Sequence, residues 1–117
     1  MIAKNDLLRL KSNIFGMKIA KLCLHLGKER NEYNLSKLLV ERWKLVQDDV
    51  TESIEAESKI DFVREIKVAD QTLSDLDVAF NNLREKDLIN ELEADILHLD
   101  VKEFQELIKI LVETEIS

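Results

Sequence analysis

The chain has 117 residues and a formal net charge of −7; 45% of its residues are hydrophobic and 35% are charged. This balance excludes an intrinsically disordered protein, and no apolar run approaches the roughly 20 residues that cross a bilayer. The single cysteine, Cys23, can form no internal disulfide, so we expect a cytoplasmic protein that does not contact a membrane.

The composition is typical of long helices. There is no proline and there are only two glycines, while Leu, Ile, Glu and Lys dominate. The length suits one domain. We therefore predict an all-α fold, an antiparallel up-down four-helix bundle with helices at about residues 6–26, 32–57, 58–85 and 89–115.

The first predicted helix has an unusually broad apolar face. It begins at Asn5 or Asp6, either of which can cap it, and ends where Gly27 supplies a stop. A face this broad either lies deep in a bundle or contacts another subunit. The narrow stripe is Leu8, Phe15, Ile19, Leu22 and Leu26, and the residues that widen it are Leu7, Leu10, Ile14, Met17 and Leu24.

The second predicted helix contains the only tryptophan, Trp43, which we expect in the core or at a subunit interface. Paired carboxylates in its second half could bind a metal ion, but no histidine stands at the matching offset, so we interpret them as a solvated face. The apolar stripe is Leu35, Leu39, Trp43, Val46, Val50 and Ile54, and the acidic residues are Asp48, Asp49, Glu52, Glu55 and Glu57.

The third predicted helix has the clearest pattern in the chain. Ser58 and Asp61 have the spacing of a capping box and mark its start. Its apolar residues alternate between spacings of four and three, which places them on one stripe that must pack against the other helices. They are Phe62, Ile66, Ala69, Leu73, Leu76, Phe80 and Leu83.

The fourth predicted helix has two apolar stripes that are offset by about one position. Asp100 and Glu103 form a capping pattern where the offset occurs. This predicts a kink or break near Asp100, or else a continuous helix that rotates its contacts or absorbs an insertion as a bulge. One stripe is Ile89, Leu92, Ile96 and Leu99, and the other is Leu97, Val101, Phe104, Ile108 and Leu111.

Residues that could support catalysis are few. Asp95 and His98 have the carboxylate-x-x-His spacing of a di-metal bundle, but such a site needs two of these motifs and only one is present. Cys23 and His25 are two residues apart, which does not place them side by side on a helix. We therefore expect no catalytic, cofactor or metal site, and no enzyme.

The charges are segregated along the chain. Residues 1–46 carry ten Lys and Arg against four Asp and Glu, whereas residues 47–117 carry seven against twenty. This pattern indicates either a basic nucleic-acid surface or two complementary surfaces that attract each other within one bundle or between subunits. We favour the second interpretation, because the acidic half would repel a phosphate backbone.

Several segments resemble a known family. Lys18–Leu22, Glu32–Leu39 and Ser58–Phe62 are similar to the small four-helix bundle proteins encoded in 23S rRNA intervening sequences, the S23-type family. The similarity covers most of residues 15–111. The chain departs from the family pattern at residues 41–50, where relatives carry small residues, at Asp87-Leu88, and before Phe104, where about three residues are added.

The resemblance implies an antiparallel bundle whose relatives form five-fold rings, so we expect a homo-oligomer, most simply a pentamer. It also implies kinship with the accessory variability protein of diversity-generating retroelements, which binds a reverse transcriptase and nucleic acid. The alternative function is therefore an accessory protein for RNA, cDNA or a nucleic-acid enzyme. Its candidate basic surface comprises Lys11, Lys18, Lys21, Lys28, Arg30, Lys37, Arg42 and Lys44.

Overall fold

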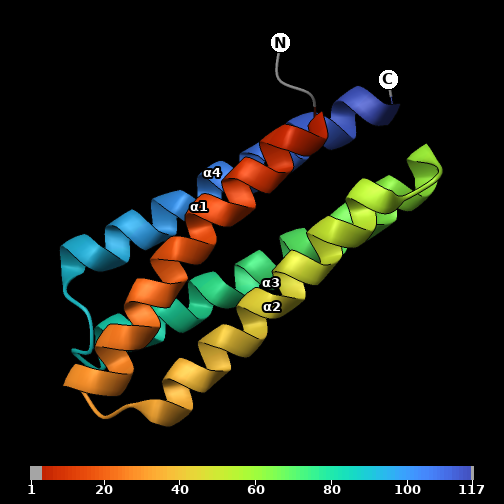
Figure 1. The fold of residues 1–117 in the computed structure, drawn as a ribbon. Helices are drawn as coiled ribbons and strands as arrows, with labels where there is room; N and C mark the ends of the chain where they lie inside the picture. The colour runs from red at the N-terminus through yellow and green to blue at the C-terminus, as the bar shows by residue number, and fades with distance from the viewer. Residues whose placement is uncertain (1–3, 117) are drawn as a thin grey trace.

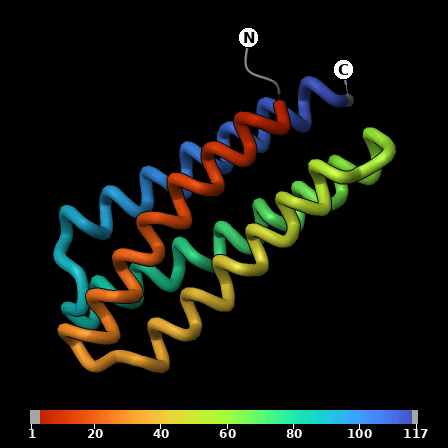
Figure 2. The backbone as a smooth tube through the Cα atoms, in the orientation of Figure 1, coloured from red at the N-terminus to blue at the C-terminus, as the bar shows by residue number. Residues whose placement is uncertain are grey.

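The computed structural model describes residues 4–116, and within this range the chain forms four α-helices joined by short connections (Figure 1). Consecutive helices run in opposite directions, and both ends of the described chain lie at the same end of the bundle (Figure 2). The molecule measures 45 × 24 × 22 Å. The predicted all-α four-helix bundle is confirmed. The elements are α1 (Lys4–Leu24), the π-helical turn η1 (His25–Glu29), α2 (Tyr33–Glu55), α3 (Lys59–Glu85) and α4 (Glu91–Ile116).

An aromatic layer joins the four helices in the core. Each helix contributes one ring to it: Phe15 from α1, Trp43 from α2, Phe80 from α3 and Phe104 from α4. The Phe15 ring stacks on Trp43 with a centroid distance of 5.1 Å and lies 6.4 Å from Phe80 and 6.2 Å from Phe104. All four side chains are buried, and Phe15 is the ring that contacts the other three. The seven apolar residues predicted to form the α3 stripe are also all buried.

Gly16 allows α1 to approach α2 closely at this layer. A Cβ atom at Gly16 would lie 3.0 Å from Nε1 of Trp43 and 3.2 Å from its Cζ2. The large indole therefore packs against bare backbone. Residues 41–50 of α2 lack the small side chains that relatives carry there. The small residue that permits close contact is instead Gly16 on α1, opposite Trp43.

The end of the first helix differs from the prediction. Gly27 does not stop the helix: the chain continues through the π-helical turn to Glu29, and neither glycine has a positive φ. The left-handed residue is Asn31, with φ of 56°, a conformation that asparagine tolerates better than most residues. The amide of Glu32 then donates to the carbonyl of Leu26 at 2.7 Å and closes the turn.

Side chains cap the starts of α3 and α4. The hydroxyl of Ser58 accepts a hydrogen bond from the amide of Asp61 at 3.1 Å, which confirms the start predicted for the third helix. At α4, Asn90 and Glu93 form a reciprocal capping box: Asn90 Oδ1 accepts from the Glu93 amide at 2.8 Å, and Glu93 Oε1 accepts from the Asn90 amide at 3.2 Å.

Helix α4 is continuous, so the break considered near Asp100 does not occur. The two offset stripes are instead two faces of one helix. The stripe that includes Val101 and Phe104 is buried against the other helices, whereas Leu92, Ile96 and Leu99 are exposed. Ile89, the first residue of that stripe, precedes α4 and is buried in the core, so the exposed part of the stripe is Leu92, Ile96 and Leu99. Neither an insertion bulge nor a rotation of the contacts is needed, because these three side chains lie on the exposed face of α4. None of the helices in residues 4–116 is long and apolar enough to cross a membrane.

Candidate functional site: the outer face of helices α1 and α4

A row of lysines on α1 faces acidic residues on α4. Lys11 and Lys18 are seven residues apart, so they lie on one line along the helix. Lys11 Nζ lies 3.1 Å from Glu103, and Lys18 Nζ lies 2.8 Å from each carboxylate oxygen of Asp100. One further heptad towards the start, Lys4 bridges to Glu115 and its ammonium also lies 4.0 Å from the centroid of the Phe62 ring.

This row explains part of the charge segregation. The basic first helix and the acidic fourth helix attract each other within one bundle, as one of the interpretations from the sequence proposes. Each pair contributes at most about 1 kcal/mol, because exposed ion pairs gain little in water. The row therefore fixes the alignment of α1 with α4 more than it stabilises the fold.

An apolar surface borders the lysine row on both sides, and we call it the α1/α4 apolar face. Its α1 residues follow one stripe beside Lys11 and Lys18, and its α4 residues share a stripe with Glu103, the partner of Lys11. The eight side chains are each between 45% and 68% exposed. They are Leu10, Ile14, Met17 and Leu24 on α1, and Leu92, Ile96, Leu99 and Ile110 on α4.

A hollow of about 280 Å³ opens in this face. Its apolar wall is made by Leu22, Ile96 and Leu97, and its rim carries Lys18, Lys21, His25 and Glu93. His25 closes one end of the bundle: its Nδ1 lies 2.7 Å from Glu29, and its Nε2 lies 3.3 Å from the carbonyl oxygen of Leu88 in the α3–α4 connection. The hollow thus combines an apolar wall with a mainly basic rim.

Cys23 and His25 do not form a nucleophile pair. The thiol of Cys23 donates to the carbonyl of Ser36 at 3.5 Å, and burial raises its pKa above the ordinary value. A thiol with a raised pKa is a poor source of thiolate. Cys23 therefore packs as a small apolar residue between α1 and α2, while His25 binds Glu29 and Leu88.

The structure places the eight basic residues predicted for nucleic acid in different settings. Lys11 and Lys18 are paired with α4, and Lys21 lies at the rim of the hollow. The other five, Lys28, Arg30, Lys37, Arg42 and Lys44, are exposed. Lys37 and Lys44 share a face of α2 because they are seven residues apart, and the position of Arg42 between them places it on a different face.

Three carboxylates crowd together where α2 packs on α3. One ligand oxygen from each of Asp49, Glu52 and Glu65 lies within 4.8 Å of the others. The pKa of Glu52 is raised mainly by a side-chain hydrogen bond with Glu65 and, second, by electrostatic repulsion from the same carboxylate. The pKa of Asp49 is raised mainly by burial and, to a smaller extent, by electrostatic repulsion from Glu65 and Asp48. The sequence identified the α2 carboxylates but not their neighbour Glu65, which stands 13 residues beyond Glu52.

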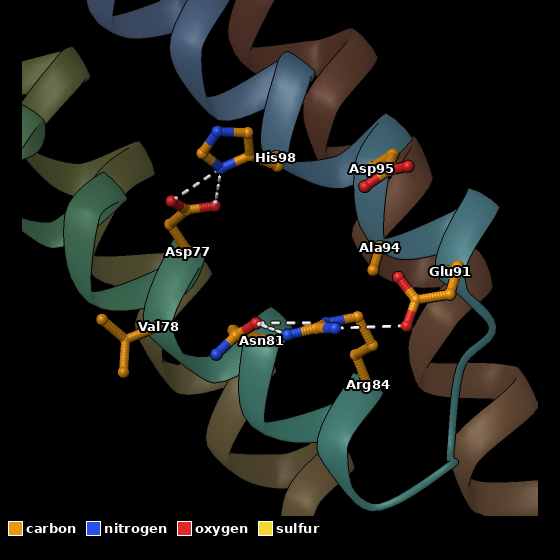
Figure 3. Close-up of a pocket in the computed structure, with 8 residues that line it drawn as sticks. All are labelled: Asp77, Val78, Asn81, Arg84, Glu91, Ala94, Asp95 and His98. Atoms are coloured by element: carbon orange, nitrogen blue, oxygen red, sulfur yellow. Dashed lines mark hydrogen bonds and ion pairs between the residues drawn. The ribbon is translucent and has the colours of Figure 1, made fainter.

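A second hollow, of about 450 Å³, lies between α3 and α4 (Figure 3). His98 is in it, but its Nδ1 lies 2.9 Å from both carboxylate oxygens of Asp77, so its partner is not Asp95 as the helical spacing suggested. The sequence could not reveal this contact, because Asp77 belongs to another helix. The lining residues are Asp77, Val78, Asn81, Arg84, Glu91, Ala94, Asp95 and His98.

Comparison with known proteins identifies the fold. No family model and no curated protein matches the chain. Among solved structures it is similar to a protein of unknown function from the S23 ribosomal protein family of Bacteroides thetaiotaomicron VPI-5482, with a TM-score of 0.87. The chain has the fold of an S23 family protein. The match covers 95% of this chain and 99% of that chain at 20% sequence identity. It supports the S23-type resemblance predicted from the sequence, and at this identity it establishes the fold alone.

Proposed function

We propose that this protein is a non-enzymatic assembly module that forms homo-oligomers through the α1/α4 apolar face. The observation that carries the proposal is the exposure of eight large apolar side chains on one face of a small bundle. Exposed apolar surface of this extent is characteristic of interaction sites, because leaving it in water has a free-energy cost. The S23 family protein with the same fold is itself of unknown function, so the proposal rests on the surface.

The chemistry of the opposite side of the bundle favours a head-to-tail contact. On α2, Leu38 and Leu45 are exposed, and Leu38 lines a hollow of about 260 Å³ against α3. Asp49 and Glu52 lie on the same stripe of α2 as Leu38 and Leu45, at helical spacings of four and three, and they belong to the carboxylate cluster. This surface is apolar with an acidic end, whereas the α1/α4 apolar face is apolar with a basic rim that includes Lys21.

Two unlike surfaces that complement each other suit a heterologous interface, which can close into a ring. We propose a pentameric ring, as the S23-type resemblance implies. In this arrangement the α1/α4 apolar face of one copy packs on the α2/α3 surface of the next. The basic rim then lies near the acidic cluster, in which Arg64 contacts Glu65 at 3.5 Å while Asp49 and Glu52 make no ion pair with any residue of the range 4–116.

The test is the solution mass of variants measured by light scattering on a size-exclusion column. Met17→Glu places a charge in the middle of the α1/α4 apolar face, and we expect it to reduce the mass to that of a single chain. Val78→Glu is the matched control, since Val78 is 62% exposed and lines the hollow between α3 and α4, outside both the α1/α4 apolar face and the hollow between α2 and α3; it should keep the wild-type mass. Equal masses for wild type and Met17→Glu would contradict the proposal.

The second candidate is an accessory protein that binds RNA, cDNA or a nucleic-acid enzyme such as a reverse transcriptase. It is favoured by the exposed basic residues Lys28, Arg30, Lys37 and Lys44, which make no ion pair with any residue in the described range 4–116. This function predicts RNA affinity that falls steeply with salt, because cationic contacts release counterions. Assembly without any RNA shift at low salt would exclude RNA binding.

A further inference from the structure

A small polar hollow lies between α1 and α2, and we call it the α1/α2 hollow. Its volume is about 120 Å³. Ser12 stands four residues before Gly16, the residue that packs against Trp43, so both short residues lie on the flank of α1 that faces α2. The lining residues are Arg9, Ser12, Asn13, Gln47, Val50, Thr51 and Ile54.

Ser12 is a buried side chain whose hydroxyl has no hydrogen-bond partner among residues 4–116; it is 6% exposed. The other two buried polar side chains of the described range differ from it. Ser53 donates to the carbonyl of Val50 at 2.7 Å, and Thr72 donates to the carbonyl of Val68 at 3.2 Å. Buried polar groups are normally hydrogen-bonded, because leaving the bond unmade has a free-energy cost. Since Ser12 lines the hollow, its hydroxyl is available to a group that occupies the hollow.

Arg9 brings an unpaired guanidinium to the same hollow. It makes no ion pair or hydrogen bond with any residue of the range 4–116, whereas Arg64 and Arg84 are paired with carboxylates. The planar fork of a guanidinium matches the oxygens of phosphate and carboxylate groups. Asn13 lies four residues further along α1, on the same face as Arg9, and adds an amide donor.

The α2 wall adds two more polar side chains. Gln47 and Thr51 are four residues apart, so they share a face of α2, and neither side chain is hydrogen-bonded to a residue of the range 4–116. Amide and hydroxyl groups can all donate hydrogen bonds. No carboxylate is among the described residues that line the hollow, so the formal charge of the lining is positive. These donors favour an anion.

The size of the hollow and the number of its donors restrict the anion. Pockets for drug-sized ligands span roughly 300–1,000 Å³, so a hollow of about 120 Å³ suits a single small group. A carboxylate has two oxygens, whereas a phosphate group offers additional acceptor oxygens. Donors on both walls can therefore be satisfied more fully by a phosphate group than by a carboxylate.

We propose that the α1/α2 hollow binds a phosphate group. The guanidinium fork of Arg9 and the hydroxyl of Ser12 hold it from α1, and the side chains of Gln47 and Thr51 donate to it from α2. Inorganic phosphate and the phosphoryl group of a small phosphate monoester share this chemistry. The hollow has no residue in common with the α1/α4 apolar face, so the proposal is independent of self-assembly.

The test is isothermal titration calorimetry of the whole protein with sodium phosphate, with sodium chloride of equal ionic strength as the reference. Arg9→Gln should weaken phosphate binding by about tenfold, because it removes the charge-assisted hydrogen bonds. Arg42→Gln is the matched control, since Arg42 is an exposed arginine on α2 that does not line the hollow. It should leave the affinity within about twofold. Unchanged circular dichroism verifies that both variants are folded.

Ser12→Ala separates binding from folding. The hydroxyl of Ser12 makes no hydrogen bond with a residue of the range 4–116, and alanine has the higher helix propensity. The variant should therefore keep or raise the urea midpoint in phosphate-free buffer. It should still weaken phosphate binding by about threefold to tenfold, because one hydrogen bond to the anion is lost.

Three results would overturn the proposal. The first is the absence of saturable phosphate binding to wild type at millimolar concentration. The second is an equal loss in Arg9→Gln and Arg42→Gln, which would show that overall charge determines the binding. The third is acetate binding as tightly as phosphate. Glycerol 3-phosphate distinguishes the two sources of the group: tighter binding than inorganic phosphate supports a monoester, and equal or weaker binding supports inorganic phosphate.

Discussion

Phe15→Ala is the substitution that should cost the fold most, because Phe15 is the ring that contacts the aromatic residues of the other three helices. It is 2% exposed, and replacing a buried phenylalanine with alanine costs about 3–5 kcal/mol. Its three ring contacts place it in the upper part of that range, since each aromatic pair adds about 0.5–1.5 kcal/mol beyond area burial. We expect a loss of about 4–5 kcal/mol.

Urea unfolding at fixed protein concentration measures this loss, followed by circular dichroism and by the fluorescence of Trp43, which stacks on Phe15. Domains of this size are stable by about 5–15 kcal/mol, so the variant should fold but unfold at a much lower midpoint. Ile60→Ala, at an exposed site on α3, should change the free energy of unfolding by less than about 0.5 kcal/mol. A loss below about 1.5 kcal/mol for Phe15→Ala would refute the central role of this ring.

Three further substitutions test separate features. Gly16→Leu should lower the free energy of unfolding by roughly 1–2 kcal/mol and shift the fluorescence of the only tryptophan, because overpacking against the indole outweighs the gain in helix propensity. A double-mutant cycle of Lys18→Met and Asp100→Asn should give a coupling of about 0.2–1 kcal/mol that decreases in high salt. Glu52→Gln should raise the urea midpoint at pH 7, because it removes one of three crowded carboxylates, whereas Glu55→Gln on the same helix should not.

The pH dependence of Glu52→Gln follows from the direction of the pKa shift. A carboxyl group whose pKa is raised in the folded state binds its proton more tightly there than in the unfolded chain, so it destabilises the fold when it is ionised. The advantage of Glu52→Gln should therefore be complete well above the raised pKa of Glu52. It should diminish as the pH falls through that pKa towards the ordinary value of 4.5. An advantage that stays constant down to pH 4 would contradict the crowding.

Much of the fold could be predicted from the sequence because the apolar spacing is local information. The stripe from Phe62 to Leu83 names seven buried residues of α3, and Ser58 marks its start. The end of α1 could not be predicted in the same way. Gly27 was the predicted stop, but the chain completes a π-helical turn beyond it, and Asn31 takes the left-handed conformation instead.

The candidate sites depend on contacts between helices, so the sequence indicates them only in part. The broad apolar face of the first helix could be predicted from the sequence. The exposure of Leu92, Ile96 and Leu99 on α4 could not, because the sequence does not show which of the two stripes is buried. The pairing of Lys11 with Glu103 spans 92 residues, and no local pattern indicates it. The partner of His98 was missed for the same reason, because helical spacing relates it to Asp95 while the fold places it beside Asp77.

The most direct test of self-assembly is the solution mass of the wild-type protein by light scattering, in about 0.1 M and about 1 M salt, where the Debye length falls from about 10 to 3 Å. We predict a mass near five chains at both salts, because apolar burial at the α1/α4 apolar face survives screening. The mass of a single chain at both salts would contradict the account.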